Sequence, residues 1–396
     1  MIRNNTYTAP PEVGYLGSRA LIVGVVGLIA LGIGFFFDKD QFFRAYLVGF
    51  IYWLGAALGS LGFLMIQYLT GGSWGVVTRR IFEAAARTVF PLGLILFIPI
   101  VLGMGSLYEW THADKVAVDP ILQHKQPYLN VTFFLIRAAV YFLVWWLLSS
   151  MLSRLSKAHD DTGDHGKRQR MADLSGPGVL AYGLTMTFAA FDWVMSLDPH
   201  WYSTIYGLMV IAGQGINAIS LAIIIAVNLA KREPMEHVYR PSHFHDLGKL
   251  LFALVMVWAY FSYSQLVIIW AANLPEEITW YLRRWSGKWS LVGWAVLLFH
   301  FAVPFTILLF RDLKRHARRL IWVAGLMMFM RMLDLVFLVA PEPGSPSRLS
   351  TAWMYVAATL GIGGVWLWVF SQNLRSRSLL PVNDPQFEDA LAAHSH

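Results

Sequence analysis

The sequence predicts an all-α polytopic membrane protein with ten transmembrane helices. Hydrophobic residues make up 57% of the 396 residues, and charged residues make up only 14%. Average soluble domains carry about 25% charged residues. The apolar runs are long enough to cross a hydrocarbon core, which takes about 20 residues of helix. These observations indicate a chain that is surrounded mostly by lipid.

The predicted spans follow one another along the whole chain. In order they are Ala20–Phe37, Ala45–Leu69, Thr88–Tyr108, Leu129–Ser153, Ser175–Met195, Ser203–Ala230, Leu250–Leu274, Trp289–Phe310, Arg318–Val339 and Leu349–Leu374. The first, third, seventh, eighth and tenth are the clearest, because each is a long run without Asp, Glu, Lys or Arg. The prolines at 91, 99 and 304 predict kinks in the third and eighth helices. The glycines at 361, 363 and 364 predict close packing of the tenth helix.

We predict three regions: a polar N-terminal segment 1–18, a membrane domain 19–374 and a C-terminal tail 375–396. The first span is followed by Asp38-Lys39-Asp40, whereas a cleaved signal peptide would have small residues there. We therefore expect this segment to remain in the protein as its first transmembrane helix. The long connections are Gly105–Tyr128 and Arg154–Leu174. The second contains His159-Asp160-Asp161, but its composition is typical of a flexible, solvated loop, and we predict no metal site there.

Basic residues predict the orientation. With ten spans, both termini and the even-numbered loops share one face. That face carries Arg79, Arg80, Arg154, Lys157, Lys167, Arg168, Arg170, Lys231, Arg232, Arg240, Arg311, Lys314, Arg315, Arg318 and Arg319. The opposite loops carry fewer, so the positive-inside rule places both termini in the cytoplasm. The net charge of +7 then reflects orientation and attraction to anionic lipids rather than nucleic-acid binding.

The residues that the chain lacks narrow its chemistry. It has no cysteine, which excludes cysteine-ligated iron–sulfur clusters and covalently attached c-type haem. Of the 12 histidines, only His300 lies deep in a predicted span, so a facing pair of haem ligands is missing. We expect no haem, no iron–sulfur cluster and no metal in this chain.

Ionisable residues inside the spans are the first candidate functional residues, because they are costly in lipid. Glu83 and Arg87 lie four residues apart at the cytoplasmic start of the third helix. They fit an ion pair on the helix surface and equally the inner mouth of a proton path.

A second group lies near the outer face. Asp192 ends the fifth helix, where the helix dipole opposes a carboxylate, and Arg137 of the fourth helix is its natural partner, with Glu109 and His112 close enough to join. Asp198-Pro199 suits a turn and helix start, while Trp193, Trp201 and Tyr202 suit an interfacial aromatic belt. Arg137, Asp192, Asp198 and His200, beside the aromatic rings at 188, 191 and 193, also suit a quinone, a flat apolar ring with two oxygens.

The third group lies at mid-membrane, with His300 on the eighth helix and Arg331 and Asp334 on the ninth. Ionisable residues at this depth are typical of proton relays, and a histidine can pass protons in either direction. The polar residues Tyr260, Tyr263, Ser264, Gln265, Gln214 and Asn217 extend the relay through water. The alternative is a buried structural network in which Arg331 and Asp334 neutralise each other.

The run Phe-Asp-Trp-Val-Met-Ser-Leu-Asp-Pro-His-Trp-Tyr-Ser-Thr-Ile-Tyr-Gly at 191–207 resembles the second quinone-binding-type membrane subunit of bacterial alternative complex III. This complex is a quinol:cytochrome c or electron-acceptor oxidoreductase, and its subunit is related to membrane anchors of the polysulfide reductase type. The resemblance extends to chain length, span count and the segment His243–Lys249.

The resemblance implies two four-helix bundles, helices two to five and six to nine, flanked by helices one and ten. It implies a bacterial inner-membrane location and partners: a paralogous quinone-binding membrane subunit, and subunits with iron–sulfur clusters and multiple c-type haems. It also implies that quinol chemistry belongs to the paralogue and proton conduction to this subunit.

Two other functions stay open from the sequence. A secondary transporter would have two inverted halves with broken helices around a midplane site, but matching broken segments are not found in the two halves. A non-catalytic scaffold would fill the bilayer and bury partner helices, and its intramembrane charges would be dispensable once the complex has assembled.

Overall fold

The computed structural model describes residues 7–342, 349–384 and 386–388. Over these residues the chain is helical and contains no strand, and ten of its helices are long and apolar enough to cross a membrane. The predicted fold class, an all-α polytopic membrane protein with ten spans, is therefore confirmed.

Seven spans are continuous or nearly continuous helices, and three combine consecutive segments. The spans are α1 (Pro11–Phe37), α2 (Lys39–Thr70), α3 (Ser73–Ala86) with η1 (Val89–Gly93) and α4 (Leu94–Leu102), α8 (Val131–Thr162), α9 (His165–Trp193) with η3 (Met195–Leu197), α10 (Tyr206–Leu229), α11 (Pro241–Ala272), α13 (Trp289–Ala295) with η5 (Val296–Ala302) and α14 (Val303–Leu309), α16 (Ala317–Val339), and α17 (Trp353–Arg375). The connections contain α5 (Met104–Leu107), η2 (Glu109–Thr111), α6 (Ala113–Val118), α7 (Pro120–Lys125), η4 (Met235–His237), α12 (Pro275–Arg284), α15 (Arg311–Arg315) and η6 (Leu349–Thr351).

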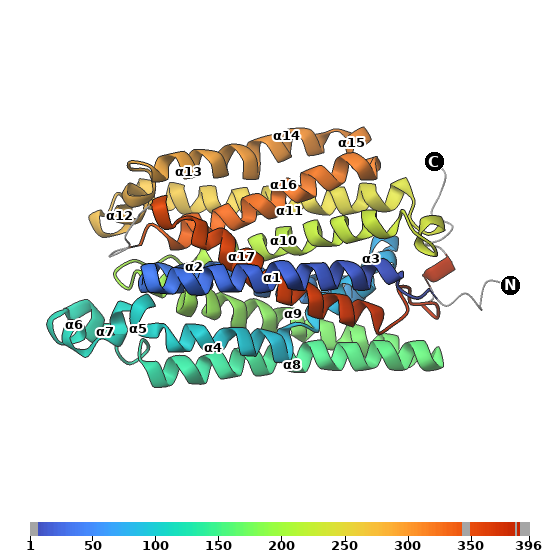
Figure 1. Ribbon diagram of the computed structural model, residues 1–396, viewed down its shortest axis with the longest axis horizontal. Helices are drawn as coiled ribbons and strands as arrows, with labels where there is room; N and C mark the ends of the chain where they lie inside the picture. Colours follow the sequence, from blue (N-terminus) through green and yellow to red (C-terminus); the bar gives the residue numbers. More distant parts are fainter. Residues whose placement is uncertain (1–6, 343–348, 385, 389–396) are drawn as a thin grey trace.

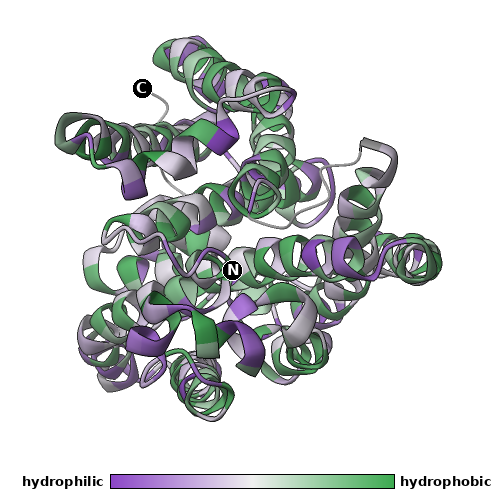
Figure 2. Cartoon of the chain, turned by 90° about the vertical axis from the view of Figure 1, so that its left-hand side faces the viewer, coloured by the Kyte–Doolittle hydropathy of each residue, from purple (hydrophilic) through white to green (hydrophobic). Residues whose placement is uncertain are grey.

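The long helices run side by side, and the short ones gather at the two ends of the molecule (Figure 1). We call the end with the start of α3 and with α15 the Arg80 end. The end with α5, α6, α7 and α12 is the Asp192 end. In a view along the helix axes from the Asp192 end, green apolar residues are present on helices throughout the bundle (Figure 2).

The helix α2 is the centre of the fold. Every residue from 43 to 65 is buried, as expected for a helix that is apolar on all sides. It packs against α1, α3, α9, α10, α16 and α17, and α10 in turn packs against α9, α11 and α16. The division into two four-helix bundles stays a prediction, since the contact between α2 and α10 joins the two sets of helices.

The first and last spans pack closely along glycines. A Cβ atom added to Gly27 would lie 2.7 Å from the backbone nitrogen of Gly361, and one added to Gly24 would lie 2.8 Å from the Cα atom of Gly364. Both contacts are with backbone atoms, so side chains cannot relieve them. The prediction of close packing at the glycines of the tenth helix is supported by this contact of α17 with α1.

The prediction of a flexible loop at Arg154–Leu174 is wrong. The helix α8 continues to Thr162 and α9 begins at His165. Gly163 closes the first helix with a φ of 67°, which glycine adopts without steric cost, and the Asp164 side chain accepts the backbone N–H of Gly166 at 2.8 Å. Both helices therefore extend beyond the apolar part of their sequence, and His159 is buried, with its Nδ1 2.9 Å from the carbonyl oxygen of Asp164.

The kink predicted at Pro91 is present. Phe90 has extended backbone angles, φ −137° and ψ 134°, between α3 and α4. Pro99 lies inside α4 and Pro304 near the start of α14, directly after the π-helical turn η5. The third span therefore changes direction about where its charged first half meets its apolar second half.

The described part of the C-terminal tail covers the Arg80 end. The backbone N–H of Leu379 donates to the carbonyl of Tyr7 at 2.7 Å, and Leu379 and Leu380 are buried. The second part of the predicted segment 1–18 is helical, because α1 begins at Pro11. Residues 1–6 and 389–396 of the two predicted terminal segments lie outside the described residues.

We expect Gly27→Ala to lower the thermal stability of the purified protein in detergent. The added methyl group meets the backbone of α17, and overpacking of this kind costs about 1–3 kcal/mol. Thermal unfolding followed by circular dichroism measures the change. Gly32→Ala is the matched control on the same helix, because nothing lies within 4 Å of its added Cβ. Equal midpoints for the two variants would contradict the role of the glycine contact.

Candidate functional site

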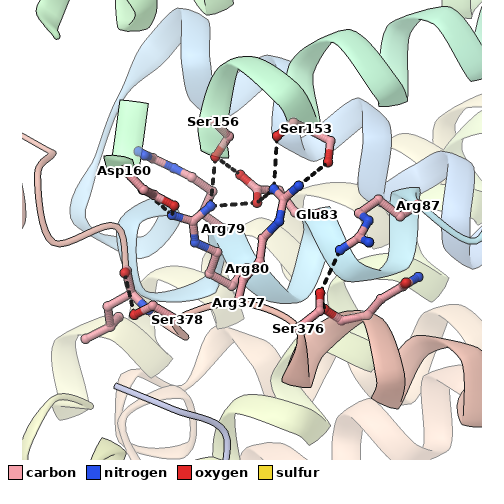
Figure 3. A network of polar contacts seen from close by, with 12 residues as sticks. Arg79, Arg80, Glu83, Arg87, Ser153, Ser156, Asp160, Ser376, Arg377 and Ser378 are labelled. Atoms are coloured by element: carbon pink, nitrogen blue, oxygen red, sulfur yellow. Dashed lines mark hydrogen bonds and ion pairs between the residues drawn. The ribbon is translucent and has the colours of Figure 1, made fainter. Parts of the chain in front are cut away.

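Glu83 is the centre of a buried polar network at the Arg80 end (Figure 3). Its carboxylate accepts hydrogen bonds from Arg80 at 2.7 Å, Ser156 at 2.5 Å, Tyr68 at 3.1 Å and Arg377 at 3.3 Å. These groups come from α2, α3, α8 and the segment after α17. Only 2% of the Glu83 surface is exposed, so the network satisfies a carboxylate that burial alone would strongly destabilise.

The predicted surface pair between Glu83 and Arg87 is not formed. Arg87 instead donates to the Ser376 hydroxyl at 3.0 Å, on the other side of the network (Figure 3). Glu83 pairs instead with two other cations. Arg80 lies three residues before it on α3, and Arg377 lies in the segment after α17. The spacing of charges along the third helix therefore gives no information about Arg377, the second cation that binds Glu83.

Further ion pairs extend the network to the helix ends. Arg80 also reaches Asp160 on α8 at 2.5 Å, and Arg79 lies 2.7 Å from Asp384 of the tail. Burial alone would raise the pKa of Asp384, but the neighbouring Arg79 holds it below its usual range. The C-terminal tail is therefore attached to the bundle by charge as well as by apolar packing.

Arg137 and Asp192 form the pair that the sequence predicts. The guanidinium donates through Nε and Nη2 to the two carboxylate oxygens of Asp192, at 2.8 and 2.9 Å, and Tyr141 donates to the same carboxylate at 2.8 Å. Asp192 is fully buried. Such a bidentate pair is strong and fixes the angle between α8 and α9.

Glu109 and His112 do not join this pair, contrary to the prediction. Glu109 accepts from Lys115 at 2.8 Å, and the Nε2 of His112 lies 2.8 Å from the carbonyl oxygen of Gly105. Both contacts lie within the exposed connection between α4 and α8. The short helices of this connection satisfy their polar groups locally.

The aromatic residues after Asp192 are mostly buried. Trp193 is 1% exposed and its ring packs against Phe50, Phe97, Tyr141, Phe142 and Trp145. Trp201 stacks on Trp280 with ring centroids 4.9 Å apart. The prediction of an interfacial aromatic belt is wrong for Trp193 and Trp201, because both rings are buried in the packed interior. Tyr202 is exposed.

Asp198 and His200 have partners of their own. Asp198 forms an ion pair with Arg283 of α12 and accepts the backbone N–H of His200, so it stabilises a turn. It does not begin a helix, since α10 begins later, at Tyr206. The Nε2 of His200 lies 2.6 Å from Asp119, and this hydrogen bond lowers the pKa of Asp119. The four quinone-site candidates are thus distributed over three separate contacts.

The mid-membrane group is brought together as predicted. Arg331 and Asp334 form a buried ion pair on α16. The Arg331 guanidinium packs against Gly213 of α10, where an added Cβ would lie 2.2 Å from its Cζ atom. His300 lies on the π-helical turn η5, within the electric field of both charges, and π-helical turns are frequent at functional sites.

His300 is fully buried and stacks on Trp258, with ring centroids 4.4 Å apart. Neither of its ring nitrogens makes a hydrogen bond to a described residue. A buried polar group without a partner is costly. A weak interaction with the backbone of Met330 is its one polar contact among the described residues, so most of the hydrogen-bonding capacity of the imidazole is left for water or a transferred proton.

A cavity of about 440 Å³ lies beside Asp334, between α10, α11, α12, η5 and α16. Its wall is mostly apolar and aromatic, and its polar groups include Asp334 and Gln265. Gln265 donates to the Tyr281 hydroxyl at 3.3 Å, and burial raises the pKa of Tyr281 to about 12. The volume lies in the range of small-molecule sites and is large enough for several waters.

Sequence reasoning missed a fourth group, near the Asp192 end. Arg284 is fully buried, pairs with Glu342, donates to the Phe337 and Leu338 carbonyls at 3.0 and 2.7 Å, and lies 3.6 Å from the centre of the Trp280 ring. Burial raises the pKa of Glu342 more than Arg284 lowers it. In the sequence Arg284 counts only among the fewer basic residues of the opposite loops, and Glu342 is 58 residues away, so no local pattern links the two.

Tyr206 lies between this group and the mid-membrane group. Its hydroxyl is buried, makes no hydrogen bond to a described residue, and experiences the charges of Arg284, Glu342, Asp334 and Arg331. Titratable groups therefore follow one another from His300 through Asp334 and Tyr206 to Glu342.

No model of a known protein family matches this chain, and no curated protein matches it at a significant level.

We expect Asp192→Asn to destabilise the protein strongly. Arg137 would keep its charge in a buried position without a carboxylate, a change that costs about 3–5 kcal/mol. Thermal unfolding in detergent at neutral pH measures the loss. Glu109→Gln is the control, because its pair with Lys115 is partly exposed and is worth about 0–1 kcal/mol. Similar stability for both variants would show that Asp192 is not needed to hold Arg137.

Proposed function

We propose that this chain is an integral membrane subunit of a quinol:electron-acceptor oxidoreductase of the alternative complex III type. In this proposal it works in the bacterial inner membrane with both termini in the cytoplasm. Its partners are a paralogous quinone-binding membrane subunit, iron–sulfur and multi-haem cytochrome c subunits, and lipids. Support comes from the resemblance at residues 191–207, the ten spans and the lack of cysteine.

The role that we propose within such a complex is proton translocation. The observation that carries it is the succession of buried titratable groups His300, Asp334, Tyr206 and Glu342, of which Asp334 lines the cavity. A membrane protein that only fills space has no need for these groups, which are expensive at this depth. Glu83, with Arg80 and Arg87 near it, is the corresponding group at the proposed cytoplasmic mouth.

In the proposed path a proton enters from water near Glu83 and passes to the central group. The carboxylate of Asp334, paired with Arg331, acts electrostatically on the His300 imidazole, so in this proposal His300 is the base that receives the proton. The Tyr206 hydroxyl then connects this group to Glu342, which lies next to the Arg283–Asp198 contact at the proposed outer face. Quinol, when bound nearby, supplies the electrons to the partner subunits.

The quinone candidates Arg137, Asp192, Asp198 and His200 belong to the same proposal. Asp192 has both oxygens occupied by Arg137 and Tyr141, so a ring would have to bind beside this pair rather than between its members. This agrees with an arrangement in which the paralogous subunit carries the quinol chemistry and this chain contributes a neighbouring surface.

Purification from the native membrane in mild detergent tests the assignment to a complex. We expect haem-containing and iron–sulfur subunits to purify with the chain, together with quinol oxidation activity. A lone polypeptide without haem absorbance would refute the assignment and favour a transporter.

For the proton path, we expect Asp334→Asn to lower the number of protons moved per electron in reconstituted vesicles, while quinol oxidation stays measurable. The amide keeps the size of the side chain but removes the titratable group. Because it also leaves the buried Arg331 without a carboxylate, the ratio is measured on complex whose folding has been checked by thermal unfolding. Tyr206→Phe and Glu342→Gln are expected to act in the same direction. Asp246→Asn, at an exposed pair with Lys249, is the control. An unchanged proton-to-electron ratio in all three variants would remove this path and favour a scaffold role.

A further inference from the structure

A groove of about 460 Å³ lies at the Arg80 end between η1, α4, α8 and α17. Its lining changes character along its length. Arg87, Arg154 and Arg377 lie together with several serines, and Phe90, Ile95 and Trp146 form an apolar section. Phe90 and Trp146 pack against each other with ring centroids 5.4 Å apart. We propose that this groove is a binding site for one anionic phospholipid, with the phosphate at the arginines and the acyl chains along the apolar section.

The charge balance of this end supports an anionic ligand. The carboxylates of Asp384, Asp160 and Glu83 pair with Arg79, Arg80 and Arg377. No carboxylate of a described residue lies within ion-pair distance of Arg87 or Arg154, the other two cations that line the groove.

Arg87 also experiences the charge of Arg377. Glu83 offsets part of the repulsion between these like charges, and an anion bound in the groove would be attracted by all three arginines. Arg87 uses one of its donors on Ser376, and the described residues show no hydrogen bond from Arg154, which leaves both with N–H groups that can bind a phosphate oxygen.

The depth of the groove favours a lipid over a free anion. On α8 the exposed apolar side chains Leu147 and Met151 are followed directly by Arg154, which marks where the hydrocarbon core ends. Ile95 of α4 is 56% exposed on the apolar side. The arginines therefore lie at the level of lipid phosphate groups, and the apolar section lies at the level of the chains. Basic pockets between helices on the cytoplasmic side are known to bind such headgroups.

Two double variants of the full-length chain test the proposal. Arg87→Gln with Arg154→Gln removes both uncompensated cations from the groove. Arg311→Gln with Arg318→Gln removes two cations at the same end but outside the groove, and changes the net charge by the same amount. Each protein is delipidated in detergent, mixed with phosphatidylglycerol, phosphatidylcholine or inorganic phosphate, and examined by native mass spectrometry and thermal unfolding.

We expect the wild type and the Arg311/Arg318 variant to retain one phosphatidylglycerol in preference to phosphatidylcholine. The Arg87/Arg154 variant should bind it about 30-fold more weakly, since each arginine near an anionic lipid contributes roughly fivefold. Because Arg154 is exposed, Arg154→Gln alone should fold normally and show about a fivefold loss.

Equal losses in the two double variants would overturn the proposal, since they would indicate diffuse attraction to the basic surface. Equal retention of phosphatidylcholine, or stabilisation by inorganic phosphate as large as that by the lipid, would overturn it too. The test is independent of the proposed proton path, because lipid binding is measured without any electron transfer.

Discussion

The cost of placing charge inside a lipid-surrounded bundle is the constraint on which the rest of this structure depends. The buried arginines described above meet it with a carboxylate partner. Three of these ion pairs also connect separate segments: Arg80 and Asp160 link α3 to α8, Arg137 and Asp192 link α8 to α9, and Arg284 and Glu342 link α12 to the end of α16. Because breaking such a pair leaves an isolated charge, each one holds its helices in a defined relation. The apolar contacts around these ion pairs stabilise the packed helices, but they are not directional and do not by themselves determine how the helices are oriented.

Apolar side chains provide the packing around the central helix α2. It is buried along almost its whole length and contacts both groups of helices. Its neighbours α9, α10 and α16 carry Asp192, Tyr206, Arg331 and Asp334. The polar groups of the proposed proton path therefore lie around a rigid apolar axis, which favours stable distances between them.

The sequence was sufficient to predict the ten spans, because length and lack of charge determine them directly. It also predicted the pair of Arg137 with Asp192, two isolated charges at similar depths, and gave the pair of Arg331 with Asp334 as one of two alternatives. It failed for Glu83, whose second cation, Arg377, comes from the far end of the chain. It failed again at 154–174, where a polar composition was interpreted as a loop although α8 and α9 continue beyond the membrane. A partner that is distant in the sequence, such as Arg377 for Glu83, leaves no local pattern in the sequence. The polar ends of α8 and α9 lack the periodic apolar residues by which a helix is recognised.

The contact between α1 and α17 has a consequence for biosynthesis. Of the ten described spans α1 is translated first, but α17, which covers its glycines at 24 and 27, is translated last. Until then these glycines face lipid or a neighbouring protein, and α1 is held mainly by its contact with α2. A nascent chain that stops before α17 therefore displays an incomplete surface, which an insertase or a membrane protease can distinguish from the finished protein. Closure of α1 onto α17 therefore requires that all ten described spans have been made.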